Sequence, residues 1–257
     1  MCELFGISGR ESFIVNEYLK KFFDRSNLHP HGWSLACMEA NEAFIEKEPM
    51  QASKSNYLRE RLSLNMEVKN AIAHIRYATI GNVEYPNCHP FTKKDKNGRR
   101  WTQVHNGTIF DYPPLRKYTG IQKGSTDSER ILLYLVDQIE KEEHLAGQKL
   151  SAIERFRILD HIFVQMSRGN KLNLLLYDGE CMYVHTNYSK SLYFLEKEKY
   201  TLFSTVPLTE EAWELLPMNT LLAYQEGKLI YKGTDHGNEY IDSEENMKFL
   251  YQIFSHL

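Results

Sequence analysis

Short apolar segments lie near both ends of the chain, and longer segments with helical periodicity lie between them. Residues 4–8 form an apolar run of the kind found in buried strands. In the last third, Asp178-Gly179 and Glu226-Gly227 each separate two short apolar segments, a pattern typical of β-hairpins. Because strands and helices do not alternate strictly, the pattern argues against a doubly wound parallel sheet. We therefore predict an α+β fold in one domain.

The expected elements follow from the apolar periodicity along the chain. The predicted strands are 4–8, 33–38, 43–46, 71–76, 101–105, 172–177, 181–185, 221–225 and 228–232. Helical spacing begins at Ser12 and recurs over 58–66, 126–139, 151–166 and 250–257. Capping-box patterns precede two of these helices, at Thr126 to Glu129 and at Ser151 to Glu154. Residues 82–100 are predicted to form a polar loop.

Composition narrows the class of protein. With 257 residues, 42% hydrophobic and 25% charged, the chain is ordinary globular material rather than disordered or coiled-coil. A net charge of −3 gives no support for a nucleic-acid or anionic-membrane partner. Four scattered cysteines without a CxxC pair favour the reducing cytoplasm, and the sequence contains no apolar run long enough to span a membrane.

The placement of one cysteine is unusual, because Cys2 directly follows Met1. If Met1 is removed, as we expect, Cys2 carries a thiol and a free α-amine in one residue. The amine titrates at about 7.7–8.0, so it can accept the thiol proton and return it to a leaving group. The alternative interpretation is that Cys2 is a small buried residue on the first strand.

Asn106-Gly107 follows the predicted strand 101–105. An Asn-Gly pair most often forms a tight hairpin turn. A side-chain amide beside a glycine N–H can also supply the two donors of an oxyanion hole. Both interpretations stay open from the residues alone.

Two charged residues suggest a grip on an α-amino acid. Arg76 ends the predicted strand 71–76, where it is either a solvated edge residue or a bidentate clamp on a carboxylate. Asp127 lies in the first turn of a capped helix, where it either complements the helix dipole or receives a substrate ammonium.

Taken in order, these motifs resemble those of class II glutamine amidotransferases, and most closely a stand-alone bacterial glutaminase-like branch. The resemblance runs from Cys2 to about Lys232. It rests on Cys2-Glu3-Leu4-Phe5-Gly6-Ile7, His74-Ile75-Arg76-Tyr77-Ala78-Thr79, His89-Pro90-Phe91, His105-Asn106-Gly107, Thr126-Asp127-Ser128-Glu129 and Thr205-Val206-Pro207-Leu208-Thr209. It implies an N-terminal nucleophile hydrolase with a four-layer α-β-β-α sandwich, formed by residues 2–257 as a single domain.

The resemblance also implies roles for individual residues. Cys2 corresponds to the nucleophile, with its own amine as the base, and Asn106 with Gly107 to the oxyanion hole. Arg76, with Thr79 nearby, corresponds to the group that holds the substrate α-carboxylate, and Asp127 to the group that holds the α-amine.

One segment departs from the branch that this chain resembles. The branch usually has Asp-Gly-Trp-Gly where this chain has His31-Gly32-Trp33-Ser34. Because that loop lies near the nucleophile in the family, the difference bears on substrate preference and on activity itself.

The implied activity is hydrolysis of the γ-amide of glutamine, or of another γ-glutamyl compound, through a Cys2 thioester. The resemblance implies no cofactor and no metal, and an ammonia-accepting synthase subunit would be a natural partner.

One alternative is a non-catalytic sensor that binds glutamine through Arg76 and Asp127. Another is a metal hydrolase using some of the ten histidines, although none shows helical ligand spacing. The apolar stripe through Leu250, Phe254 and Leu257 is either core or the face of a homo-oligomer.

Overall fold

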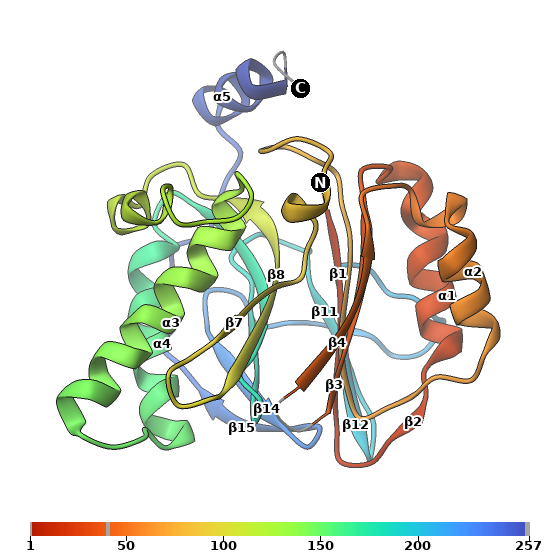
Figure 1. The fold of residues 1–257 in the computed structure, drawn as a ribbon, viewed down its shortest axis with the longest axis horizontal. Coiled ribbons are helices and arrows are strands. Elements are labelled where there is room, and N and C mark those ends of the chain that lie inside the picture. Colours follow the sequence, from red (N-terminus) through yellow and green to blue (C-terminus); the bar gives the residue numbers. More distant parts are fainter. Residues whose placement is uncertain (1, 40–41, 255–257) are drawn as a thin grey trace.

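The computed structural model describes residues 2–39 and 42–254, in which two antiparallel sheets pack face to face between two pairs of helices (Figure 1). The first sheet has the strand order β13-β11-β12-β1-β6-β3-β4, and the second has the order β15-β14-β10-β9-β8-β7. A small additional sheet pairs β2 with β5. This is the four-layer α-β-β-α sandwich that the resemblance implied.

The bounds of the elements are as follows. The strands are β1 Glu3–Gly9, β2 Phe13–Ile14, β3 Trp33–Glu39, β4 Glu42–Glu48, β5 Glu67–Val68, β6 Asn70–Ile75, β7 Phe91–Lys94, β8 Arg100–Thr108, β9 Lys171–Tyr177, β10 Met182–His185, β11 Tyr193–Glu196, β12 Tyr200–Ser204, β13 Glu214–Leu215, β14 Leu222–Gln225 and β15 Lys228–Lys232. The helices are α1 Asn16–Asp24, α2 Asn56–Ser63, α3 Asp127–Ala146, α4 Ala152–Met166 and α5 Glu244–Phe254. Short 3-10 turns lie at Arg25–Leu28, Ala52–Lys54, Tyr85–Asn87 and Pro113–Tyr118.

Three apolar clusters hold the layers together. One lies between the α3/α4 pair and the second sheet, and includes Trp101, Leu135 and Phe163. A second joins α1 and α2 to the first sheet. The third lies between the two sheets and includes Leu4 and Val104. Because both sheets are covered on both faces, central strands such as β1 and β9 are buried along their whole length rather than on one face only.

Strand β1 is central to the first sheet. It pairs with β12 on one side and β6 on the other, and all of its residues are buried. Its first residue, Glu3, lies in an ion pair with Arg25, with Nε to Oε2 and Nη2 to Oε1 distances both of 2.6 Å. His29 also contacts the Glu3 carboxylate, at 3.1 Å. These contacts fix the start of β1 and therefore the position of the residue before it, Cys2.

The predicted strands and helices are confirmed, with several corrections. Residues 82–100 are not one polar loop, because β7 pairs with β8 within them. Helix α1 begins at Asn16 rather than Ser12, since Phe13 and Ile14 are taken up by pairing with β5. The short strands β2, β5, β11, β12 and β13 are not among the predicted strands. The Thr126 side chain accepts the Glu129 amide as predicted, but the Glu129 carboxylate turns to Lys123 and Gly124 instead of closing the box.

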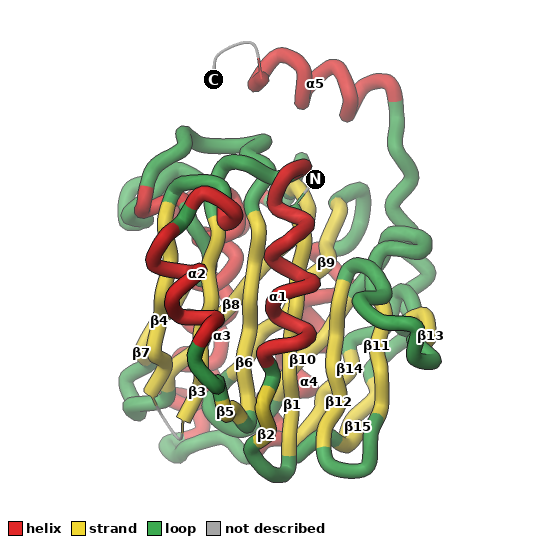
Figure 2. The backbone as a smooth tube through the Cα atoms, turned by 90° about the vertical axis from the view of Figure 1, so that its right-hand side faces the viewer, coloured by secondary structure: helices red, strands yellow, loops and turns green. Residues whose placement is uncertain are grey.

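The C-terminal helix α5 lies apart from the sandwich, beyond the end of the sheets at which Cys2 is placed (Figures 1 and 2). Leu250 faces the sandwich and lines a cavity there. Leu257 and the side chain of Phe254, which complete the predicted apolar stripe, lie outside the part of the chain that the structure describes. Along the described part of the chain, no helix combines the length and apolar character needed to cross a membrane.

Candidate functional site

Cys2 lies at the beginning of β1, beside the segment that leaves β6. Its thiol donates to the carbonyl oxygen of Tyr77, and the Tyr77 amide donates to the sulfur, both at 3.3 Å. Burial raises the pKa of this thiol, while the Tyr77 bond and the Arg76 charge act in the opposite direction. Cys2 is thus held by backbone contacts, and its thiol has the raised pKa of a buried group.

The Asn-Gly pair lies inside a strand, so the hairpin-turn interpretation is wrong. Strand β8 continues through Thr108, and Asn106 and Gly107 pair with Asn173 and Leu172 of β9. A methyl group at Gly107 would overlap the Lys171 carbonyl oxygen, so only glycine fits in this register. Both residues line a small cavity of about 40 Å³ together with Cys2.

That cavity is lined by residues from five separate parts of the chain. Its lining residues are Cys2, Thr79, Asn106, Gly107, Thr108, Phe110, Lys171, Tyr240, Asp242 and Leu250. The predicted nucleophile, the predicted oxyanion donors and Thr79 are therefore brought together. Arg76 and Asp127 are not among the lining residues, although both are close enough to affect the pKa of the Cys2 thiol.

Asp127 is the first residue of α3 and is 4% exposed. Its carboxylate accepts the amide of Ile109 at 2.8 Å and that of Ser128 at 2.9 Å. The helix end is tied to β8 by His105, whose Nδ1 lies 3.0 Å from the Ser128 hydroxyl. Through its bond with Ile109, Asp127 is held beside the residues that directly follow the predicted oxyanion donors.

Arg76 is also buried, and its guanidinium organises the loop that follows it. Nη1 donates to the carbonyl oxygen of Asn82 at 2.8 Å, and Nη2 donates to those of Ile80 and Gly81 at 3.0 and 2.9 Å. Burial lowers the pKa of Arg76, and the Cys2 thiol counters that shift. In this structure the Arg76 guanidinium is hydrogen-bonded to the loop that follows it. Its contact with a substrate carboxylate stays a prediction.

Two buried residues near the site were not singled out from the sequence, one at the loop after Arg76 and one at the start of α3. Asn87, which is fully buried, donates to the Asn82 carbonyl at 3.1 Å and accepts the Ser125 amide at 2.7 Å. It therefore links the Arg76 loop to the approach of α3. The other is His105, which the motif had drawn attention to only as a neighbour of Asn106. A buried Asn or His has no sequence period of its own, so neither role could be foreseen.

The departure at His31 has a visible consequence. His31 Nδ1 accepts the amide of Ala78 at 2.9 Å, and Ala78 lies between Tyr77, which contacts Cys2, and Thr79. Burial, and next the Arg76 charge, lower the pKa of His31. The neighbouring His29 ring is paired with the Glu3 carboxylate. Among residues 2–39 and 42–254, no three His, Cys, Asp or Glu side chains are grouped to hold a metal ion.

Lys171 forms the floor of the cavity on the β9 side. It is 4% exposed, and its Nζ lies 3.3 Å from the ring centroid of Tyr188 and 6.0 Å from that of Tyr240. Burial lowers its pKa to about 8, partly countered by Asp242 and Cys2. A cation enclosed by aromatic rings is thus placed beside the predicted nucleophile.

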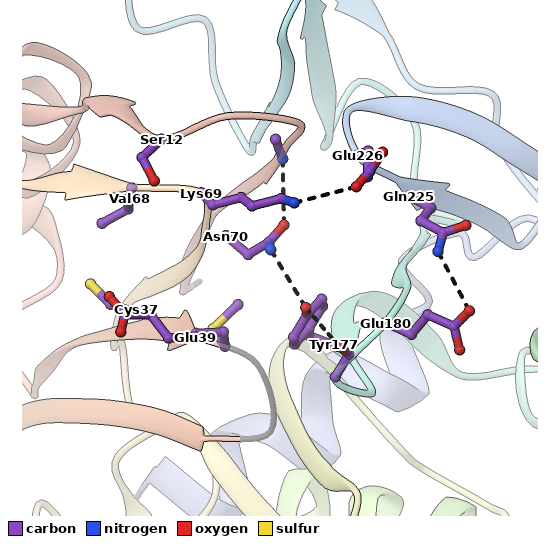
Figure 3. A pocket seen from close by; sticks show the side chains of 13 residues that line it. Ser12, Cys37, Glu39, Val68, Lys69, Asn70, Tyr177, Glu180, Gln225 and Glu226 are labelled. Atoms are coloured by element: carbon purple, nitrogen blue, oxygen red, sulfur yellow. Dashed lines mark hydrogen bonds and ion pairs between the residues drawn. The ribbon is translucent and has the colours of Figure 1, made fainter.

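A larger cavity, of about 440 Å³, lies at the other end of β1, around Gly9 (Figure 3). Two polar contacts lie in its walls. The Lys69 ammonium donates to the Glu226 carboxylate at 3.3 Å, and the Gln225 amide donates to the Glu180 carboxylate at 3.4 Å. Since β1 has seven residues, roughly 20 Å separate this cavity from Cys2. None of the predicted catalytic or substrate-binding residues lines it.

Comparisons with known proteins bear on the family. A family model described as class II glutamine amidotransferases matches residues 1–199. An uncharacterised protein of Methanocaldococcus jannaschii is 30% identical over 259 residues, covering 90% of this chain and 71% of that protein. The crystal structure of a "predicted glutamine amidotransferase" from Pseudomonas aeruginosa has a TM-score of 0.66 at 20% identity, covering 90% of this chain and all of that one.

A second solved structure, glutamine phosphoribosylpyrophosphate amidotransferase from B. subtilis, has a TM-score of 0.61 at 17% identity. The match covers 89% of this chain but only 48% of that one. At these identities the two solved structures show that the fold is shared. The family model matches far more than half of the sequence, and the chain therefore belongs to the class II glutamine amidotransferases.

Proposed function

We propose that this chain hydrolyses the γ-amide of glutamine, or of a related γ-glutamyl compound, with Cys2 as the nucleophile. The observation that carries the proposal is the single cavity lined by Cys2, Asn106 and Gly107. Residues 2–257 would act as one catalytic domain after removal of Met1, in a reducing cytoplasm that keeps the thiol free.

In the first step, the Cys2 α-amine takes the thiol proton and the sulfur attacks the γ-carbonyl carbon. The Asn106 amide and the Gly107 N–H stabilise the oxyanion, each donor contributing about 3–4 kcal/mol to the transition state. The amine then protonates the departing nitrogen, so that a C–N bond is exchanged for a C–S bond. Water, activated by the same amine, cleaves the thioester and releases glutamate.

The glutamyl half of the substrate would be recognised by Arg76 and Asp127, with Thr79 near the nucleophile. A carboxylate held by a guanidinium and an ammonium held by a carboxylate select an α-amino acid head group. Because the Arg76 Nη atoms already bond carbonyls of residues 80–82, binding is expected to rearrange this loop.

The direct test joins a mass measurement to an assay. Intact mass establishes whether Met1 is absent, and glutamine hydrolysis is followed through both ammonia and glutamate. We expect equal amounts of the two products from the processed protein, none from Cys2→Ala, and none from a form that retains a residue before Cys2. Full activity in that blocked form would contradict the role of the α-amine.

The same assay separates catalysis from sensing. If the processed protein and Cys2→Ala both bind glutamine and neither hydrolyses it, the chain is the non-catalytic sensor considered above. Equal release of ammonia and glutamate by the isolated chain would show that hydrolysis needs no partner. Ammonia that appears only when a synthase is added would instead support the proposed ammonia-accepting subunit.

A further inference from the structure

The C-terminal segment supplies one wall of the Cys2 cavity. Tyr240, Asp242 and Leu250 line it, although they are far from Cys2 in the sequence. Tyr240 is 5% exposed and Leu250 is half-buried, whereas Ile241, between Tyr240 and Asp242, is 74% exposed. Tyr240 is therefore buried against the cavity and Ile241 faces solvent, while Asp242 lines the cavity and is also exposed.

The path of this segment up to Tyr240 is fixed by buried contacts. The side chain of Asn187, which is fully buried, donates to the Asn238 carbonyl at 3.0 Å, and its backbone carbonyl accepts the Tyr240 amide at 2.7 Å. The Tyr188 hydroxyl donates to the Asp242 carboxylate at 2.8 Å. These bonds hold Tyr240 and Asp242 in place beside Lys171.

Aromatic packing continues the wall toward α5. The ring of Phe110, which follows the oxyanion donors on β8, stacks on Tyr240 at a centroid distance of 5.9 Å and contacts Phe249 at 5.7 Å. Asn246 also donates to the Tyr240 hydroxyl at 3.3 Å. Helix α5 is thus joined to the same strand end that carries Asn106 and Gly107.

The two sides of the nucleophile therefore differ. The glutamyl half would be gripped by Arg76 and Asp127, neither of which lines this cavity. When the γ-amide C–N bond breaks, the nitrogen and its substituents must lie on the side away from that grip. The cavity of about 40 Å³ has room for only a few water-sized molecules.

We propose that Tyr240, Asp242 and Leu250 form the leaving-group wall of the site, and that this wall restricts the substrate to the unsubstituted γ-amide of glutamine. This inference rests on the proposed function and narrows it. A bulky γ-glutamyl amide would have to displace Leu250 and α5, whereas ammonia fits the space beside Cys2.

The test compares glutamine with γ-glutamyl-p-nitroanilide, whose leaving group is a substituted aromatic ring. The kcat/KM ratio of anilide to glutamine is measured for the parent chain, Leu250→Ala, Leu250→Trp and Ile241→Ala. We expect Leu250→Ala to raise the ratio about tenfold or more, because removing side-chain volume from a pocket is worth that much in discrimination. Leu250→Trp should lower the ratio. The matched aliphatic control Ile241→Ala should leave it unchanged.

Opposite shifts for the two Leu250 variants separate a wall from a merely structural role, since a loss of stability lowers the active fraction for both substrates equally and leaves their ratio unchanged. A parent chain that cleaves the anilide as fast as glutamine would overturn the inference while leaving the proposed function intact. Equal ratios in all four proteins would overturn it too. Absence of turnover on both compounds in the processed parent would contradict the proposed function, and the inference with it.

Discussion

At the residue scale, the sequence indicated which side chains to consider but not what they contact. Cys2, Asn106 and Gly107 were expected from their order and chemistry, and the structure places them around one cavity. The partners of Arg76 could not be foreseen, because its three carbonyl contacts depend on how the following loop folds back. Side-chain identity is local information, whereas a contact depends on the path of the chain.

Asn106 offers a direct test of the oxyanion hole. Replacing it with Ala removes one proposed donor, so kcat for glutamine hydrolysis should fall about 10²–10³-fold with little change in KM. Asn70→Ala is the matched control, because Asn70 lines the larger cavity at the opposite end of β1. A similar loss of kcat in both variants would point to general disruption rather than to a lost donor.

His31 makes the site sensitive to acid. Its Nδ1 can accept the Ala78 amide only while unprotonated, and burial with the Arg76 charge keeps its pKa below the usual value. The contact is therefore kept at neutral pH and lost as the pH falls through that lowered pKa. The α-amine already gives log kcat/KM a slope of about one below pH 8, and protonation of His31 should steepen it to about two.

The variant His31→Asp provides an acceptor that stays unprotonated well below pH 6. We expect its profile to keep a slope of about one where that of the parent steepens. His161→Asp, on the exposed side of α4, should behave as the parent does. If the His31 and His161 variants have identical acid limbs, the Ala78 contact does not govern the acid dependence.

At the scale of elements, the hydrophobic pattern predicted which segments form strands and helices but not every boundary. The Asn106-Gly107 pair looked like the end of a strand, yet β8 runs on because β9 offers an unbroken partner from Lys171 onward. Similarly, Phe13 and Ile14 join a strand pair instead of α1 because β5 lies beside them. Tertiary pairing overrides local propensity in both cases.

The helix α4 is joined to the β9–β10 hairpin by a buried ion pair. Arg155 Nε donates to Asp178 at 2.8 Å, and both side chains are at most 2% exposed. Arg155→Met would leave the Asp178 carboxylate without its buried counter-charge, so the free energy of unfolding should fall by about 3–5 kcal/mol. Urea denaturation measures this loss.

Arg157→Met is the control within the same helix, because Arg157 is exposed. It should change the free energy of unfolding by no more than about 0.5 kcal/mol. The ion pair lies on the α4 side of the second sheet, outside the lining of the Cys2 cavity, so turnover per folded molecule should be the same in both variants. A small loss for Arg155→Met would mean that the methionine side chain compensates within the core.

At the scale of the whole molecule, the two sheets and the C-terminal segment each contribute to the site. Cys2 directly precedes β1 of the first sheet, Asn106 lies in the second sheet, and Leu250 lies in α5. The four layers could be anticipated only through the family resemblance, since strand periodicity does not determine how two sheets pack. The wall at Leu250 was not predictable, because no sequence pattern links it to Cys2.

A ligand bound between the two sheets should stabilise the whole fold rather than one element. In Cys2→Ala, which cannot turn glutamine over, glutamine at one hundred times its Kd would add about 2.7 kcal/mol. For a chain of this size each kcal/mol raises Tm by about 2–4 °C, so calorimetry should show a rise of several degrees in a single transition. Adding Asp127→Asn removes the proposed partner of the α-amine and should abolish most of the rise. An equal rise in both proteins would mean that glutamine binds away from Asp127, and the proposed orientation of the substrate would be wrong.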